Sequence, residues 1–143
     1  MNNTPAARLH LPRKALASCV YLGVERDTRG FQLDDAQRFN HYPAMPFPML
    51  SWTLAGRLHG VNELGARQAA GLEPALPSLM FSGPRRQPSS SWSPGPVCVL
   101  SLAFYPEALS RLLGVRMGEF QDKILPLASV ISGPLLTRLE AGV

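Results

Sequence analysis

Short apolar runs separated by turn residues dominate the first 104 positions, and their lengths predict β-strands. Residues 49–55 (MLSWTLA) alternate between apolar and polar side chains up to a glycine, as a half-buried strand does. Residues 15–24 and 78–81 are also apolar and contain strand-favouring side chains. Residues 97–104 (VCVLSLAF) are the most apolar run, which predicts a central strand buried on both faces.

The segments between these runs carry residues that interrupt regular structure. Residues 26–30 are polar and end in glycine, and residues 85–96 are rich in serine, proline and glycine, so both predict a turn or loop. Three prolines in residues 42–48 exclude a helix there. Residues 34–39 fit either a helical turn behind an aspartate cap or a strand. Residues 60–77 favour no element.

The pattern changes to a helical one after Tyr105. Pro106 suits the first turn of a helix, and Gly114 suits its end. A second helical stretch is expected at residues 118–124, and a third begins near residue 132 with Pro134 in its first turn. Strands first and helices last predict an α+β fold, mainly antiparallel sheet or barrel, followed by packing helices.

This order gives one domain in three parts. Residues 1–14 are expected to be a flexible tail or an edge segment, and residues 15–104 the β-barrel. Residues 105–143 are expected to supply the C-terminal helices of the same domain. The whole chain has 143 residues, which suits one domain rather than two.

Composition narrows the class of protein. Hydrophobic residues make up 45% of the chain and charged residues 17%, which excludes a disordered protein. The net charge is +4 and the pI about 9.6, which suggests nucleic-acid binding. The arginines are however scattered, with clusters only at residues 13–14 and 85–86. Direct nucleic-acid binding is therefore kept as a third alternative, since a phosphate-binding surface needs several cations on one face.

The compartment is expected to be the cytoplasm. Cys19 and Cys98 both lie in apolar runs, which predicts buried thiols in a reducing environment. The longest uncharged apolar run, residues 96–105, is far shorter than a membrane span, and no signal peptide is identified. No membrane partner is expected.

The sequence contains no recognised catalytic motif. His10, His41 and His59 are far apart and form no His-x-His pair, so no metal site is predicted. No Gly-x-Ser-x-Gly elbow or glycine-rich phosphate loop is present, and Asp34-Asp35 is better explained as a turn or cap. We therefore expect no cofactor and a protein that is not an enzyme.

A small-molecule pocket is the remaining candidate site. Aromatic side chains with a few polar groups in the mouth of a barrel are typical of such pockets. The same aromatic side chains could instead form the core. The candidate ligand-binding residues are Trp52, Phe81, Arg85, Trp92 and Phe104.

Several short segments resemble the N-terminal domain of AraC/XylS-type transcription regulators. In that family a strand followed by an FxPxAL…LLG pattern closes the domain's β-structure and begins its helices, as residues 103–114 do here. The resemblance covers most of residues 16–140. It is carried by residues 40–46 (NHYPAMP), 50–56 (LSWTLAG), 81–88 (FSGPRRQP), 92–97 (WSPGPV), 103–109 (AFYPEAL), 112–114 (LLG), 124–127 (ILPL) and 135–140 (LLTRLE).

The resemblance implies a cupin-like barrel that binds a small-molecule effector or mediates homodimerisation. It also implies a separate domain with two helix-turn-helix units that binds DNA, for which these 143 residues contain no candidate. Six leucines are expected to form the dimer or the junction to that domain, or else only to cover the barrel. They are Leu109, Leu112, Leu113, Leu135, Leu136 and Leu139.

The main alternative is a stand-alone cupin-like protein with its own metal or small-molecule site. A metal-dependent enzyme of this kind would require a transition metal held by His10, His41 or His59. It would not need a DNA-binding domain.

Overall fold

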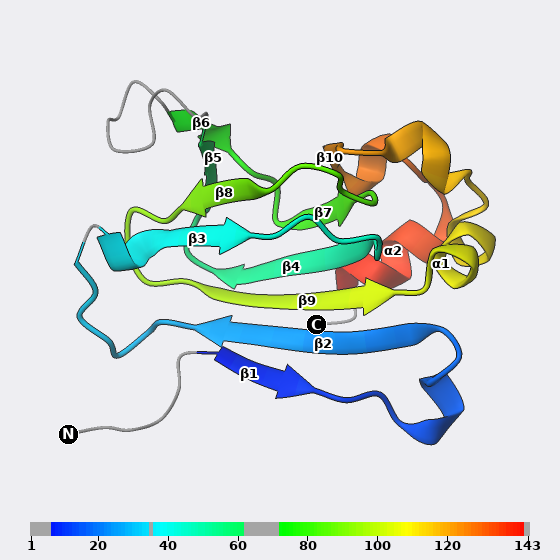
Figure 1. The fold of residues 1–143 in the computed structure, drawn as a ribbon, viewed down its shortest axis with the longest axis horizontal. Helices are drawn as coiled ribbons and strands as arrows, with labels where there is room; N and C mark the ends of the chain where they lie inside the picture. Colours follow the sequence, from blue (N-terminus) through cyan, green and yellow to red (C-terminus); the bar gives the residue numbers. More distant parts are fainter. Residues whose placement is uncertain (1–6, 35, 62–71, 142–143) are drawn as a thin grey trace.

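Two antiparallel β-sheets form the body of the protein (Figure 1). The computed structural model describes residues 7–34, 36–61 and 72–141. The six-stranded sheet contains, in spatial order, β1 (Ala7–His10), β2 (Val20–Asp27), β9 (Cys98–Phe104), β4 (Met49–Ala55), β7 (Leu79–Ser82) and β10 (Ile124–Pro126). The four-stranded sheet contains β3 (Phe39–Tyr42), β8 (Ser89–Trp92), β5 (His59–Val61) and β6 (Leu72–Ala75).

The two α-helices follow β9 in the chain and lie toward the same end of the six-stranded sheet (Figure 1). The α-helices are α1 (Pro106–Leu113) and α2 (Pro134–Ala141). Short 3₁₀ helices are η1 (Lys14–Leu16), η2 (Ala36–Arg38), η4 (Met117–Phe120) and η5 (Leu127–Ser129). Helix α1 begins at the expected proline and ends at Gly114, whose φ of 70° places it in the left-handed region that favours glycine.

Alternation along β4 assigns a side to each of its residues. Leu50 and Trp52 belong to the main core cluster with Leu109 and Leu113 of α1. Trp52 also donates a hydrogen bond from Nε1 to the carbonyl of Leu139 in α2, at 2.8 Å. Successive side chains of a strand point to opposite faces, so Ser51 and Thr53 face away from the helices.

The face away from the helices is turned toward the four-stranded sheet. A second core cluster joins Leu58, which precedes β5, to Met80 of β7 and Val99 of β9. At the end of β2, the amide of Thr28 donates to the carbonyl of Val97, and the amide of Val97 donates to Thr28 Oγ1. We call the sides of the two sheets that face each other the inner face.

The predicted fold class is confirmed: the protein is mainly antiparallel β with packing helices at its C-terminal side. The sheets remain two separate hydrogen-bonded units, so the expected barrel is not closed by strand pairing. Double-sheet jelly rolls, to which cupins belong, have this kind of architecture. Among the described residues, no helix has the length and hydropathy needed to span a membrane.

Some elements differ from their predictions. The segment 85–96, expected to be a loop, contains β8, and the expected helical stretch at 118–124 begins as η4 and ends in β10. Strand β2 extends into the predicted turn at 26–30. Residues 62–71, most of the segment without an assignment, lie outside the described residues.

Candidate functional site

The inner face is polar at positions where a core would be apolar. The register of the strands shows which residues lie on the inner face. Val24, Ser101, Ser51 and Met80 lie side by side across four strands. We call the following set the inner polar surface, contributed by β2, β3, β4, β8 and β9: Arg26, Asn40, Tyr42, Ser51, Ser91 and Ser101.

Two hydrogen-bonded groups organise this surface. On the four-stranded sheet, Asn40 Nδ2 donates to Ser91 Oγ at 3.2 Å, and Tyr42 Oη lies 3.0 Å from the same oxygen. On the six-stranded sheet, the hydroxyls of Ser51 and Ser101 lie 2.8 Å apart. Asn40 and Ser91 are only 6% and 3% exposed, which is rare for polar side chains without a function or a complete set of partners.

The partners of this surface are incomplete. Asn40 Oδ1 and Arg26 Nε are buried and have no hydrogen-bond partner. The other end of the Arg26 guanidinium, Nη2, donates to the carbonyl of Gln37 at 3.3 Å. A buried polar atom without a partner costs about 1–3 kcal/mol. Such atoms are therefore expected where a ligand or an ordered water completes the site.

Arg85 shares this property at a different place. Its Nε and Nη1 are buried and have no hydrogen-bond partner. Arg85 lies in the connection from β7 to β8 and pairs with Met45, next to the end of β4 that begins with Met49. Arg26 pairs with Val99 of β9, and Val99 pairs in turn with Thr53, near the other end of β4. The two arginines therefore lie at opposite ends of the six-stranded sheet.

The inner face remains partly open to solvent. Val24, Thr53 and Ser101 are half-buried although each belongs to a strand with neighbours on both sides. A fully packed sandwich would bury such positions. These three positions of the inner face are therefore in contact with solvent.

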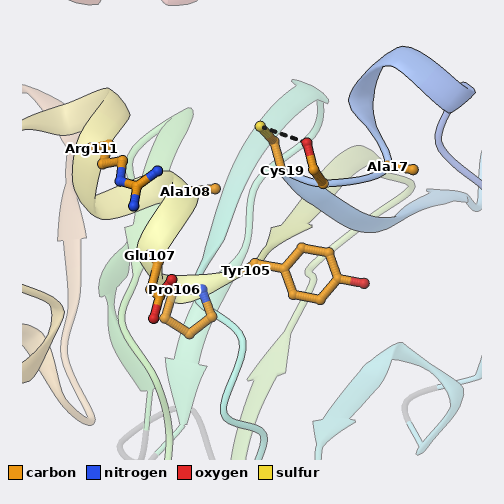
Figure 2. Close-up of a pocket in the computed structure, with 8 residues that line it drawn as sticks. Ala17, Cys19, Tyr105, Pro106, Glu107, Ala108 and Arg111 are labelled. Atoms are coloured by element: carbon orange, nitrogen blue, oxygen red, sulfur yellow. Dashed lines mark hydrogen bonds between the residues drawn. The ribbon is translucent and has the colours of Figure 1, made fainter.

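A separate surface pocket of about 750 Å³ lies between η1 and the start of α1 (Figure 2). It is lined by Cys19, Tyr105, Glu107 and Arg111, together with smaller side chains. Its polar side chains are exposed, so water satisfies them without a ligand. The pocket gives no reason of its own for binding.

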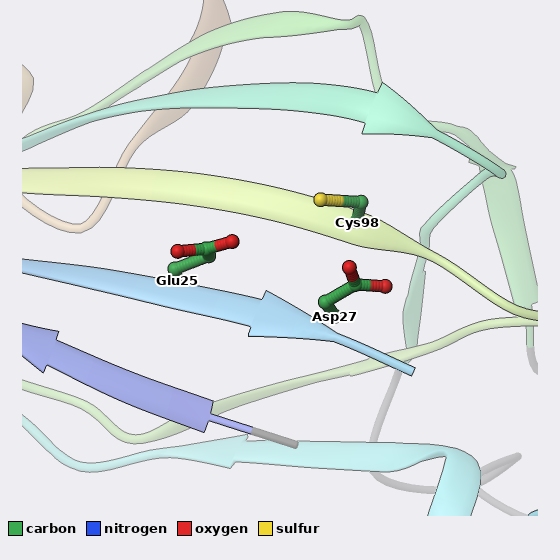
Figure 3. Close-up of side chains that lie close together, drawn as sticks. All are labelled: Glu25, Asp27 and Cys98. Atoms are coloured by element: carbon green, nitrogen blue, oxygen red, sulfur yellow. The ribbon is translucent and has the colours of Figure 1, made fainter. Parts of the chain in front are cut away.

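Two carboxylates and a thiol form a cluster on the opposite face of the six-stranded sheet. Glu25 and Asp27 of β2 and Cys98 of β9 point to one side, with their ligating atoms within 4.8 Å of one another (Figure 3). Burial raises the pKa of the Cys98 thiol, and the nearby Asp27 carboxylate adds to this effect. The thiol is therefore held in its protonated form, which is a poor metal ligand.

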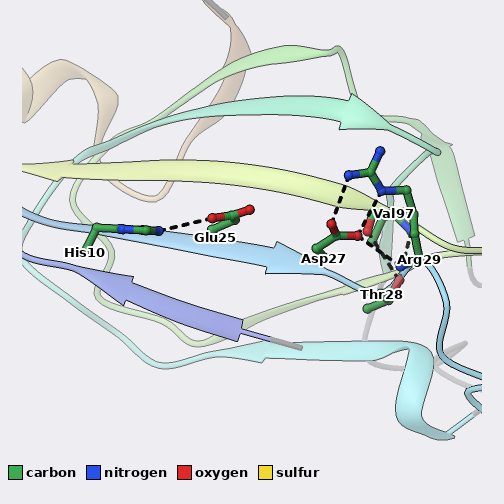
Figure 4. Close-up of polar contacts among 6 residues, drawn as sticks. All are labelled: His10, Glu25, Asp27, Thr28, Arg29 and Val97. Carbon is green, nitrogen blue, oxygen red and sulfur yellow. Dashed lines mark hydrogen bonds and ion pairs between the residues drawn. The ribbon is translucent and has the colours of Figure 1, made fainter. Parts of the chain in front are cut away.

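Both carboxylates already have cationic or basic partners (Figure 4). His10 Nε2 lies 3.1 Å from Glu25 Oε2, and Arg29 contacts both oxygens of Asp27 at 2.9 Å. The cluster is electrostatically satisfied as it stands and contains no histidine ligand. It does not fit the histidine-held metal of the alternative interpretation.

The ion pair between Asp27 and Arg29 predicts how stability depends on pH. Its hydrogen bonds from the side chain and the amide of Arg29 lower the pKa of Asp27 from 3.8 to about 2. The ion pair contributes stability above the unfolded pKa of about 3.9, and this contribution is lost as the pH falls through 2. We expect Arg29→Gln to raise the Asp27 midpoint toward 3.8 in a carboxyl NMR titration. Arg111→Gln, on α1, serves as control and should leave it at about 2; equal midpoints in the Arg29→Gln variant and the wild type would contradict the assignment.

The structure distributes the five predicted ligand residues over three places. Trp52, Phe81 and Phe104 come together in the main core cluster on the helix side. Trp92 lies on β8 beside Phe39, on the face opposite to Ser91. Arg85, in the β7–β8 connection, has the unpartnered atoms described above. Ligand contact by these residues stays a prediction.

The six leucines also divide. Leu109 and Leu113 are buried in the main cluster, and the three leucines of α2 pack against it. Leu112 is 46% exposed. Their role in a dimer or a domain junction stays a prediction, and five of the six have a packing role in the domain itself.

One of the two cysteines is placed differently from expectation. Cys19 is exposed rather than buried, because it lies in the connection between η1 and β2 and not within the strand. Cys98 is buried as expected. His10 lies on edge strand β1 and His59 on the other sheet. The side chain of His41 lies outside the described residues.

Comparison with known proteins provides little beyond the fold. No protein-family model and no curated protein matches the sequence. Two similar solved structures are of oxalate decarboxylase from Bacillus subtilis. One comes from a study of its Mn(II) centres, with a TM-score of 0.42 and 14% identity over 92% of this chain and 39% of that chain. The other, an arginine-to-alanine mutant, has a TM-score of 0.40, 15% identity and the same coverage.

The chain spans about two-fifths of the length of these structures. The expectation that it is not an enzyme is corrected by this finding, because both structures are of an enzyme. Their activity is not transferred to this chain at such low identity.

Proposed function

We propose that this chain is the regulatory domain of an AraC/XylS-type transcription regulator, and that it binds a small-molecule effector on the inner polar surface. Effector binding, or homodimer contact, would control a separate helix-turn-helix domain that binds DNA in the cytoplasm. Such control requires that the effector has different affinities for two states of the protein.

The observation that carries the binding role is the pair of unpartnered buried atoms, Arg26 Nε and Asn40 Oδ1. Folding retains this unfavourable arrangement on a face that also contains half-buried positions. A ligand that supplied the missing partners would stabilise the folded state. The regulatory role is supported by the segments that resemble this family, two of which, residues 40–46 and 50–56, overlap β3 and β4.

Asn40→Leu tests the binding role. The variant removes one hydrogen bond to Ser91 and also removes the unpaired carbonyl, so the free energy of unfolding should change by less than about 1 kcal/mol. Thermal-shift screening of small polar metabolites should identify compounds that raise the Tm of the wild type but not of Asn40→Leu.

The control is Gln87→Leu, which alters an exposed side chain in the β7–β8 connection. It should respond to the same compounds as the wild type. Compounds that stabilise the wild type and Asn40→Leu equally would place binding elsewhere and contradict the proposal.

The regulatory role is tested in the coding DNA beyond the codon for Val143. Two helix-turn-helix units in the same frame would support it. A stop codon at that point would remove the output domain and leave a cupin-like binding protein or enzyme as the better interpretation.

A further inference from the structure

The unpartnered atoms of the inner polar surface define the chemistry of what binds there. Arg26 Nε is a charged donor, and Asn40 Oδ1 is an acceptor. A ligand that satisfies both must itself carry an acceptor and a donor. Among the described residues, no carboxylate forms an ion pair with Arg26; the acidic side chains of β2 point to the other face.

The charge of the site favours an anion. Guanidinium groups bind carboxylates through short, charge-assisted hydrogen bonds that are about twice as strong as neutral ones. Arg26 Nε lies in a partly buried environment, where such a bond is screened less than on the surface. A carboxylate is therefore the group that Arg26 recognises best.

The donor that Asn40 requires must be close to that carboxylate. The guanidinium reaches Gln37, and Asn40 follows three positions later in the chain, which is at most about 10 Å. A hydroxyl group meets the requirement. An ammonium group would also donate, but it would place a second cation beside Arg26 without a described carboxylate to balance it.

We infer that the effector is a small hydroxycarboxylate, whose carboxylate binds Arg26 Nε and whose hydroxyl donates to Asn40 Oδ1. This inference rests on the proposed function. The hydroxyls of Ser51, Ser91 and Ser101 belong to the same inner polar surface and suit the remaining polar atoms of such a ligand. Arg85 lies at the other end of the sheet and takes no part.

Three matched compounds separate the two contacts. Lactate carries both groups, propionate lacks the hydroxyl, and lactamide lacks the charge. We expect lactate to bind about tenfold or more tightly than lactamide, and severalfold more tightly than propionate. The readout is ¹⁵N NMR of the Arg26 Nε–H and the Asn40 side-chain amide, titrated well into the millimolar range.

Variants locate the site. Arg26→Met keeps the aliphatic stem and removes the donor, so lactate binding should be lost while the backbone spectrum stays that of the folded protein. Arg111→Met removes a matched arginine from the surface pocket and should leave lactate binding unchanged. Loss of binding in Arg111→Met but not in Arg26→Met would overturn the inference.

The outcomes also separate the inference from the proposed function. If lactamide or glycerol perturbs Asn40 and Ser91 as strongly as lactate does, the effector is neutral; the inference is then overturned, but the inner polar surface remains a ligand site. If none of the compounds perturbs the inner face and hydrogen-bonded water accounts for both atoms, the inference and the proposed binding role both fail.

Discussion

Replacing Phe81 with alanine is expected to lower the free energy of unfolding by about 3–5 kcal/mol. Phe81 is fully buried in the main core cluster, where its ring packs edge-on against Phe120 with centroids 5.2 Å apart. The substitution leaves a cavity between β7 and the helical segment, and the surrounding backbone pairs with β4 and β10 and cannot collapse into it. Urea unfolding followed by circular dichroism measures the loss.

Leu112→Ala provides the matched control. This leucine is 46% exposed, and its truncation should change stability by no more than about 0.5 kcal/mol. The comparison also decides between the two roles considered for Phe81. If Phe81→Ala kept wild-type stability and lost only ligand binding, Phe81 would line a pocket, contrary to its place in the core.

Gly56→Ala is expected to destabilise the protein by about 2–5 kcal/mol. Gly56 ends β4 with a φ of 78°, where an alanine costs about 1–2 kcal/mol. A Cβ at this position would also lie 2.2 Å from the carbonyl oxygen of Pro96 and 2.7 Å from a Val97 methyl group. The chain would have to move at the point where β4 passes toward the four-stranded sheet.

Gly30→Ala isolates the two contributions. Gly30 has a similar φ of 86°, but a Cβ there meets no atom within 4 Å. It should therefore show only the backbone cost, about 1–2 kcal/mol. Equal losses for Gly30→Ala and Gly56→Ala in the same unfolding experiment would show that the contact with Pro96 carries no cost.

The sequence best predicted the elements whose patterns depend on neighbouring residues in the chain. Strand β4 and helix α1 match their predicted segments, because alternation up to Gly56 and the proline-to-glycine interval of α1 depend on neighbouring residues alone. Strand β8 was missed because its residues, Ser89–Trp92, have a loop-like composition. They form a strand because β3 and β5 supply hydrogen-bond partners from distant parts of the chain.

The candidate site was less accessible to sequence reasoning. The prediction was based on aromatic residues. Trp52, Phe81 and Phe104, however, lie on the sheet face that packs against the leucines of α1 and α2. Arg26 and Asn40 were not predicted as ligand-binding residues. Arg26 lay in a predicted turn, and Asn40 followed residues 34–39, which fitted either a helical turn or a strand. Their significance comes from register, which places both on the inner face, and from partners that only the folded chain reveals.

The central claim is that the inner polar surface is a ligand site, and a crystal structure of the chain grown in saturating lactate tests it most directly. The account predicts density for one lactate, with a carboxylate oxygen within hydrogen-bond distance of Arg26 Nε and its hydroxyl within reach of Asn40 Oδ1. Ordered waters on both atoms in those crystals, with no lactate between them, would contradict it.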